Sequence, residues 1–380
     1  MIRFCKKCLY PDTKPQLHFD ENGVCDACIA AEKKEQIDWD GRKEELKQLV
    51  EKYKCKDGTR YDCIIPVSGG KDSHFQTHVI KDWFGLNPLL VNFVPIDLIP
   101  LGRKNIENLK NQGVDYIEFT PNPKVYRKME KYGLVELGDA NWPEHIGIFT
   151  VPAQVAVAYK IPLIIWGENP QVEYGGPGVG NVLDRKWLES YGGFWLDKVN
   201  PVEVIMKQGI ERRHLKPYIY PTDEEINQVG VRGIFLGQYL QYDIYKEIEV
   251  VEKLGFSRNP EPKEGTYTDW ENLDTKYTGM HDYFKWIKYG FGRTTDHASI
   301  DIRVGKITRE EGLKLVKQHE GKIPLKYFND FLHDMEITRE EFYKIVDKFT
   351  NKDLFKKDKD GNLLRDKDGN LEKLQYDNIS

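Results

Sequence analysis

The sequence predicts an α/β protein: a doubly wound parallel sheet with a small cysteine-rich ribbon before it and a mostly helical region after it. Between residues 59 and 200, short apolar runs alternate with helical segments, as in parallel sheets whose strands are joined by crossover helices. Two Cys-x2-Cys pairs lie within the first 28 residues, and most segments after residue 200 have helical patterns. These three observations define the expected architecture.

Composition limits the class of protein. The chain has 380 residues, 39% of them hydrophobic and 12% aromatic, enough for two or three units with sizeable cores. Its 56 basic and 61 acidic residues give a net charge of −5, which is not typical of a nucleic-acid binder. No apolar run is long enough to span a membrane, and the first five residues lack the apolar core of a signal peptide. We therefore expect a cytoplasmic protein with reduced thiols.

The expected organisation has five consecutive parts. In chain order they are a zinc ribbon (1–30), a linker helix (31–58), an α/β core (59–200), a mostly helical substrate region (201–350) and a polar, turn-rich tail (351–380). Within residues 30–53 we expect an interruption of the helix at Asp40-Gly41.

The four cysteines within the first 28 residues are candidate metal ligands. Cys5 and Cys8 form one Cys-x2-Cys pair, Cys25 and Cys28 form the second, and 16 residues separate the two pairs. This spacing is typical of a structural zinc site, in which each pair presents two thiolates to one tetrahedral ion. Four cysteines leave no open coordination position, so we expect the ion to stabilise the ribbon. A redox or iron–sulfur role is the alternative.

The core begins with a predicted strand over residues 61–65, followed by the loop PVSGGKDS at residues 66–73 and then by a helix. Gly69 and Gly70 allow positive φ angles and close approach of the backbone to a ligand. Amides at the start of the following helix favour an anion, and Lys71 adds a cation. The loop is not a Walker motif, because Asp72 follows the lysine and the first glycine is missing. The chemistry that this loop suits is phosphate binding.

Three more core strands and a later one are predicted from apolar runs, with helices between them: strands over 88–93, 116–119, 161–166 and 231–237, and helices over 101–112, 144–159 and 241–254. We expect Pro152 to kink or break the second of these helices. In such sheets ligands bind beyond the carboxyl ends of the strands.

Two of these strand ends supply candidate ligand residues. Asn92 and Phe93 end one strand, and Gly167, Glu168 and Asn169 follow another. The acid and amide beside the phosphates suit Mg²⁺ binding or substrate orientation. A helix cap or turn is the alternative role of the glutamate.

Two further segments suggest substrate binding. Residues 170–200 are rich in glycine and aromatics, including Tyr174, and we interpret them as a substrate-facing lid, with a structural insertion as the alternative. Residues 293–303 hold two arginines, two carboxylates and a histidine. On a helix, Asp296, Ser299 and Arg303 would share a face. Arginines can clamp a phosphate, and an ion-paired helix surface is the alternative.

The C-terminal part also contains local structural signals. Capping boxes at residues 308–311 and 338–341 predict two helix starts. The repeat DKDGNL at residues 358–363 and 366–371 predicts a pair of exposed turns, since it lacks the glutamate of a calcium-binding loop.

The motifs carry a family resemblance. SGGKDS resembles the loop of the PP-loop ATP pyrophosphatases, whose fold is of the adenine nucleotide alpha hydrolase type. Together with the four-cysteine N-terminus, the WGEN at residues 166–169 and the segment YGFGRTTDH…DIR at residues 289–303, it resembles the N-acetyl sugar amidotransferases of bacterial surface-polysaccharide synthesis. The resemblance spans roughly residues 1–350 and leaves the repeated tail outside.

This resemblance implies an ATP-dependent reaction. Such enzymes adenylate an acetamido oxygen of a nucleotide-linked sugar, releasing pyrophosphate, and ammonia then displaces AMP to give an acetamidino group. The implied cofactors are ATP, catalytic Mg²⁺ and structural Zn²⁺. The implied catalytic residues are Lys71, Asp72, Glu168 and Asp296, of which the last two would bind metal or deprotonate ammonia. The implied ATP-binding residues are Ser68, Gly69, Gly70, Lys71, Asp72, Ser73, Asn92, Phe93 and Gly167. The implied substrate-binding residues are Asn169, Tyr174, Arg293, His297 and Arg303.

The source of ammonia is expected to be a separate protein. A glutaminase needs a cysteine on a nucleophile elbow or at the mature N-terminus, and neither Cys55, Cys63 nor the N-terminal Met1-Ile2 fits. We expect a partner glutaminase, with a barrel-type ammonia-channel subunit as a further possible component. The alternatives are a tRNA-modifying, thiolation-type PP-loop enzyme with a zinc ribbon and a non-catalytic nucleotide-binding scaffold.

Overall fold

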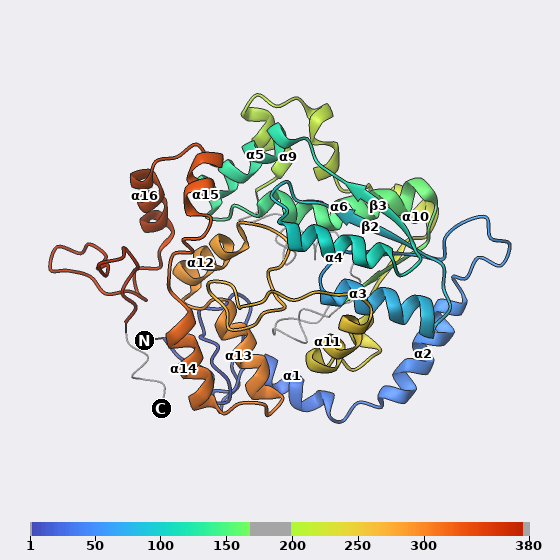
Figure 1. The fold of residues 1–380 in the computed structure, drawn as a ribbon, viewed down its shortest axis with the longest axis horizontal. Helices are drawn as coiled ribbons and strands as arrows, with labels where there is room; N and C mark the ends of the chain where they lie inside the picture. Colours follow the sequence, from blue (N-terminus) through green and yellow to red (C-terminus); the bar gives the residue numbers. More distant parts are fainter. Residues whose placement is uncertain (1, 168–198, 375–380) are drawn as a thin grey trace.

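The computed structural model describes residues 2–167 and 199–374 (Figure 1). At its centre lies a five-stranded sheet in the order β3-β2-β1-β4-β5, and every neighbouring pair is parallel. The strands are β1 (Cys63–Pro66), β2 (Pro88–Phe93), β3 (Asp115–Phe119), β4 (Leu163–Trp166) and β5 (Arg232–Phe235). Because the chain winds outward from β1 in both directions, the predicted doubly wound α/β fold is confirmed.

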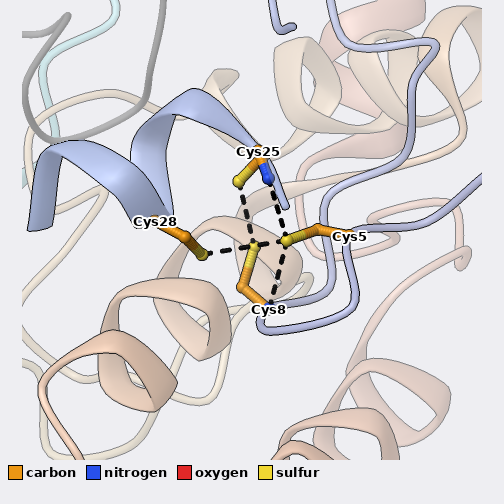
Figure 2. Close-up of side chains that lie close together, drawn as sticks. All are labelled: Cys5, Cys8, Cys25 and Cys28. Carbon is orange, nitrogen blue, oxygen red and sulfur yellow. Dashed lines mark hydrogen bonds between the residues drawn. The ribbon is translucent and has the colours of Figure 1, made fainter. Parts of the chain in front are cut away.

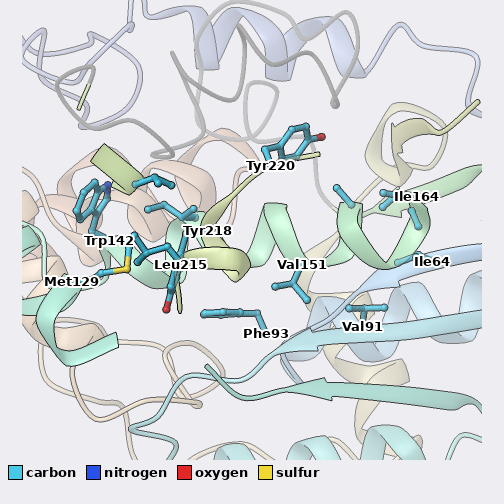
Figure 3. Close-up of a cluster of buried hydrophobic side chains, with 14 of the residues drawn as sticks. Ile64, Val91, Phe93, Met129, Trp142, Val151, Ile164, Leu215, Tyr218 and Tyr220 are labelled. Atoms are coloured by element: carbon cyan, nitrogen blue, oxygen red, sulfur yellow. The ribbon is translucent and has the colours of Figure 1, made fainter. Parts of the chain in front are cut away.

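The strands are short and mostly apolar, apart from the partly exposed edge strand β3, and their alternate side chains point to opposite faces of the sheet. Ile64 and Val91 belong to one core cluster, together with residues of α5 (Pro123–Tyr132), α6 (Trp142–Tyr159) and α9 (Pro201–Lys207), as Figure 3 shows. Ile65 and Leu90 belong to a second cluster on the other face. That face is covered by α2 (Trp39–Glu51), α3 (Lys71–His78), α4 (Pro100–Lys110) and α11 (Ile244–Lys253). Burial on both faces is what parallel sheets require.

The predicted sheet differs from the observed one in its extent. The core was expected to end at residue 200, but β5 pairs with β4 from Leu163↔Arg232 to Trp166↔Phe235. The strand predicted at residues 231–237, within the region expected to be mostly helical, is therefore part of the same sheet.

Helix predictions fail where local signals compete with packing. Pro152 does not break α6, because the helix is buried on the sheet and tolerates one lost hydrogen bond. The helix expected at residues 30–53 is interrupted before Asp40-Gly41, between α1 (Asp26–Lys34) and α2, where Asp38 caps α2 by accepting from the Gly41 amide at 3.0 Å. α5 was not predicted at all.

The other helices of the α/β part are short. They are α10 (Asp223–Val229), the π-helices η1 (Val79–Trp83) and η2 (Gly133–Leu137), and the 3₁₀-helices η4 (Arg212–Tyr218) and η5 (Leu236–Gln238). No helix of the described ranges is both long and apolar enough to cross a membrane.

The C-terminal part is a helical layer with its own apolar core. Its helices are α12 (Thr278–Tyr289), α13 (Arg293–Arg303), α14 (Arg309–His319), α15 (Phe328–Asp334) and α16 (Arg339–Phe349). Both predicted capping boxes are present, at the starts of α14 and α16. In the tail, both repeats form turns, with antiparallel bridges Lys357↔Leu363 and Arg365↔Leu371.

Candidate functional site

The loop at residues 66–73 leaves the carboxyl end of β1, the central strand, and enters α3. Gly69 has a φ of +94°, and a Cβ there would lie 2.9 Å from Cγ1 of Ile106. A side chain is therefore excluded by both backbone conformation and space. The Ser68 amide donates to Oγ of Ser73 at 2.9 Å, which fixes the loop against the first turn of α3. The site lies where the strand order reverses, between β1 and β4, as the fold class predicts.

Lys71 is almost fully buried, with 6% of its side chain exposed. Its ammonium lies 2.7 Å from the Asp72 carboxylate and 3.0 Å from the carboxylate of Glu271. Burial opposes the ionisation of Glu271, but the positive charges of Lys71, His297 and Arg293 together outweigh it, and the pKa of Glu271 falls to about 2. Glu271 was not predicted, because it lies about 200 residues from the loop in an irregular segment without a recognisable motif.

Two cavities meet at this ion-paired group. A large cavity of about 580 Å³ and a small cavity of about 260 Å³ share Lys71, Asp72 and Glu271 among the described residues that line them. The small cavity also contacts the glycine loop, from Ser68 to Gly70. The large cavity extends to the start of α11 and to α13. A ligand held by the loop would thus have a second binding space directly beside it.

The structure brings all three predicted substrate residues of α13 to these cavities. Arg293 lines the small cavity and pairs with Asp282 at 3.2 Å. His297 lines the large cavity, and its Nε2 lies 3.9 Å from Oε1 of Glu271. Burial lowers the pKa of the His297 imidazole. Arg303 also lines the large cavity. These three residues, which were predicted from a single helical segment, line the two cavities that meet at the glycine loop.

Asp296 lies elsewhere. Its Oδ1 accepts a hydrogen bond from the Tyr10 hydroxyl at 2.9 Å, and its Oδ2 pairs with Lys285. Burial opposes ionisation, but Lys285 lowers the pKa of the Asp296 carboxyl. Asp296 is 3% exposed and lines neither cavity. The described contacts attach the N-terminal ribbon to α13 and do not bring this carboxylate to the loop.

The remaining predicted residues fall into two groups. Asn92 is buried and donates to the Tyr116 hydroxyl at 2.8 Å, and Phe93 stacks on Phe119 in the core. Gly167 follows β4, and its carbonyl accepts from the amide of Gly237 at 3.0 Å. Glu168, Asn169 and Tyr174 lie outside the described residues, as does the predicted lid over residues 170–200 apart from its last residues.

The four N-terminal cysteines converge on one point (Figure 2). Cys5 and Cys8 lie in one turn, whereas Cys25 and Cys28 lie at the start of α1. Sγ of Cys5 is 3.8 Å from Sγ of Cys28, and Sγ of Cys8 is 3.6 Å from Sγ of Cys25. These separations are too long for disulfides. They match sulfur atoms about 2.3 Å from one tetrahedral ion, which are about 3.8 Å apart. The cluster fits the predicted zinc ribbon.

Part of the chain matches the model of one known protein family. Residues 264–367 match the family model described as "LPS biosynthesis protein WbpG-like, C-terminal domain". The match supports the predicted resemblance to the sugar amidotransferases over this part of the chain, which contains Glu271 and all of α13. It also extends beyond residue 350, so the first of the two tail repeats, expected to lie outside the family, lies within it.

Two individual proteins are more distantly similar. The uncharacterised protein MJ1599 of Methanocaldococcus jannaschii is 31% identical over 108 residues, which are 28% of this chain and 37% of that protein. A predicted subunit of a tRNA methyltransferase from the same organism superposes with a TM-score of 0.29 and 13% identity, over 61% of this chain and 90% of that one. A score this low does not establish a shared fold.

Proposed function

Starting from the WbpG-like LPS biosynthesis family that residues 264–367 match, we propose that this protein is an ATP-dependent amidotransferase of surface-polysaccharide synthesis. It would convert an acetamido group of a nucleotide-linked sugar to an acetamidino group. One observation carries the proposal: Lys71 and Asp72 line both the phosphate-loop cavity and the larger cavity beside it. An ATP α-phosphate at the loop would therefore lie next to a second bound substrate.

In the first step, the acetamido oxygen attacks the α-phosphorus of ATP, and pyrophosphate leaves. The loop amides at the start of α3 and the ammonium of Lys71 stabilise the charge that develops on the phosphates. Mg²⁺ bound with ATP would supply further charge neutralisation. The pairing with Asp72 and Glu271 holds the Lys71 side chain at the junction of the two cavities.

In the second step, ammonia attacks the activated carbon and the AMP oxygen leaves, carrying away the former acetamido oxygen. Loss of a proton from the added nitrogen completes the amidine. Arg293, His297 and Arg303 are proposed to bind the anionic groups and hydroxyls of the sugar nucleotide, because they line the two cavities. Glu168, Asn169 and Tyr174 remain proposed site residues, and the proposed role of Asp296 in metal binding or deprotonation would require it to leave its two present partners.

The partners and ions follow from the same proposal. A separate glutaminase, with or without a barrel-type channel subunit, would supply ammonia, so ammonium chloride should support turnover by the pure chain and glutamine should not. Zn²⁺ at the four cysteines would hold the ribbon and take no part in the reaction.

The test is pyrophosphate release from Mg²⁺-ATP and ammonium chloride with a panel of acetamido sugar nucleotides, with bulk tRNA as the competing substrate. We expect release that depends on a sugar nucleotide, and a product whose mass falls by the difference between oxygen and NH. Lys71→Met should reduce the rate about 100-fold or more, whereas Lys81→Met, at the partly exposed end of the same helical segment, should retain it. Release that depends on tRNA without a change in any sugar would refute the proposal.

A further inference from the structure

Two histidines that line the small cavity and a buried aspartate behind them form a cluster that the proposed reaction does not use. The buried carboxylate of Asp139 precedes α6, His145 lies in the first turn of α6, and His281 lies in α12. Nδ1 of His145 is 3.0 Å from one carboxylate oxygen, and Nδ1 of His281 is 2.9 Å from the other. The chain thus brings together an acid and a histidine from the α/β core with a histidine from the helical layer.

The spacing of the three donors suits a single metal ion. One ligand atom from each residue can be chosen so that all three lie within 4.8 Å of one another. Two ligands at right angles around an ion, each about 2.0–2.1 Å from it, are about 3 Å apart, which is the separation of each imidazole nitrogen from the carboxylate. The two imidazole rings have centroids 5.0 Å apart and an interplanar angle of 77°, so neither blocks the other's approach.

The cluster is open on one side. The side chain of Asp139 is 6% exposed, whereas those of His145 and His281 are 27% and 23% exposed. Both histidines line the small cavity, which the glycine loop and Arg293 also line. Three protein ligands with an open side are the usual arrangement of a metal centre that binds water or a substrate atom.

The donor types select the kind of ion. Two imidazoles and one carboxylate favour divalent ions such as Zn²⁺, Mn²⁺ and Fe²⁺, whereas Mg²⁺ prefers oxygen ligands alone. The cluster also differs from the four cysteines, whose thiolates fill all positions of a tetrahedral ion.

We propose that Asp139, His145 and His281 form a second metal centre, which binds a divalent transition-metal ion with open coordination positions toward the phosphate-loop cavity. This site is independent of the reaction proposed above, because it depends on these three ligands and not on what binds at the loop. It connects α6 with α12 and thereby joins the sheet to the helical layer.

The test uses the full chain, loaded with Zn²⁺ and dialysed, with metal content measured by plasma mass spectrometry. We expect about two ions per chain in the wild type and about one in His281→Ala or His145→Ala. The matched control is His78→Ala, which removes a histidine that also pairs with an aspartate, at 2.7 Å from Asp82, but that belongs to no three-ligand group among the described residues. The control should keep both ions.

Cobalt distinguishes the two centres by their ligands. With Co²⁺, His281→Ala should keep the thiolate-to-metal charge-transfer band of the cysteines and lose the weaker ligand-field bands of the second site. Cys8→Ser should show the reverse. Circular dichroism of each variant checks that it is folded. A wild-type chain that binds about one ion, lost on Cys8→Ser and unaffected by His281→Ala, would overturn the proposal and leave the three residues as a hydrogen-bonded group.

Discussion

At the scale of single residues, the candidate site depends on how one lysine is held. Lys71 is buried between the carboxylates of Asp72 and Glu271. The loop motif was sufficient to predict the lysine and its neighbour, because both belong to a local strand–loop–helix signal. It could not predict Glu271, which reaches the loop only through the tertiary fold. The same holds for Asp139 and His281, which are separated by more than 100 residues and share no spacing rule.

His74, in the first helix after the loop, makes the pH dependence of folding predictable. It is fully buried and contacts the Gly70 carbonyl through Nδ1 at 3.0 Å. Burial lowers the pKa of His74 to about 4, against the hydrogen bond to Gly70, which raises it. The unfolded chain, with an ordinary pKa of about 6.5, therefore binds more protons than the folded one between pH 4 and 6.5, and stability falls as the pH falls through this window.

We expect His74 to contribute about 2 kcal/mol of the stability lost between pH 7 and pH 5. His74→Gln cannot titrate and should lose about that much less than the wild type over this interval. Urea unfolding at both pH values measures the difference. Between pH 7 and pH 9 the two chains should change in parallel, which serves as the control. Equal losses at pH 5 would show that His74 becomes protonated in the folded state at its ordinary pKa.

At the scale of elements, α13 both holds the ribbon and lines the large cavity. Its predicted face placed Asp296 and Arg303 together. In the structure, Asp296 and Arg303 both lie against Tyr10 of the ribbon, and Arg303 also lines the large cavity together with His297. Leu9 also donates to the Ser299 hydroxyl at 3.3 Å. Sequence spacing could identify the residues of one helix, but not which neighbour each of them meets.

The contact between Tyr10 and Asp296 predicts how firmly the ribbon is attached. Both residues are buried, at 0% and 3% exposed. Tyr10→Phe removes one hydrogen bond to a buried charge without changing the ring, so it should cost about 1.5–3 kcal/mol of unfolding free energy. Tyr159→Phe, at a residue 53% exposed, should cost much less. Urea unfolding compares the two variants.

Measuring the metal content of Tyr10→Phe shows whether the attachment of the ribbon to α13 and the binding of its metal ion are separate. Because the four cysteines do not involve the Tyr10 hydroxyl, Tyr10→Phe should keep the ion of the ribbon. Faster proteolysis of the ribbon with unchanged metal content would agree with a weakened attachment to α13. Loss of the ion from Tyr10→Phe would instead mean that the attachment and the metal site are one unit.

At the scale of the whole molecule, the fold was more predictable than its boundaries. Apolar runs in the sequence located β1 to β5 within a few residues, because strands buried on both faces of a parallel sheet are nearly continuous runs of apolar residues. The division at residue 200 did not hold for the sheet, because pairing of β5 with β4 is a long-range property. α5 was missed although its apolar residues Val125, Tyr126 and Met129 are buried against the sheet.

The tail shows the same limit and leads to a stability prediction. The repeats were expected to be exposed turns, and their turns are exposed, but Leu371 after the second turn is 5% exposed and belongs to the core of the helical layer. Phe355 also enters this core, with its ring centroid 4.8 Å from that of Trp286 in α12. The tail therefore completes the helical layer.

Leu371→Ala should consequently destabilise the folded chain by about 2–5 kcal/mol, the usual cost of truncating a buried leucine. Leu364→Ala, at the residue that follows the first repeat and is 36% exposed, should change the free energy of unfolding by about 0.5 kcal/mol or less. Urea unfolding of both variants measures the difference, with tryptophan fluorescence reporting the surroundings of Trp286. If the two substitutions cost the same small amount, the tail does not contribute to the core, and the helical layer ends with α16. A larger loss of unfolding free energy for Leu371→Ala than for Leu364→Ala would instead show that the tail contributes Leu371 to the core of the helical layer, although the repeats are otherwise polar.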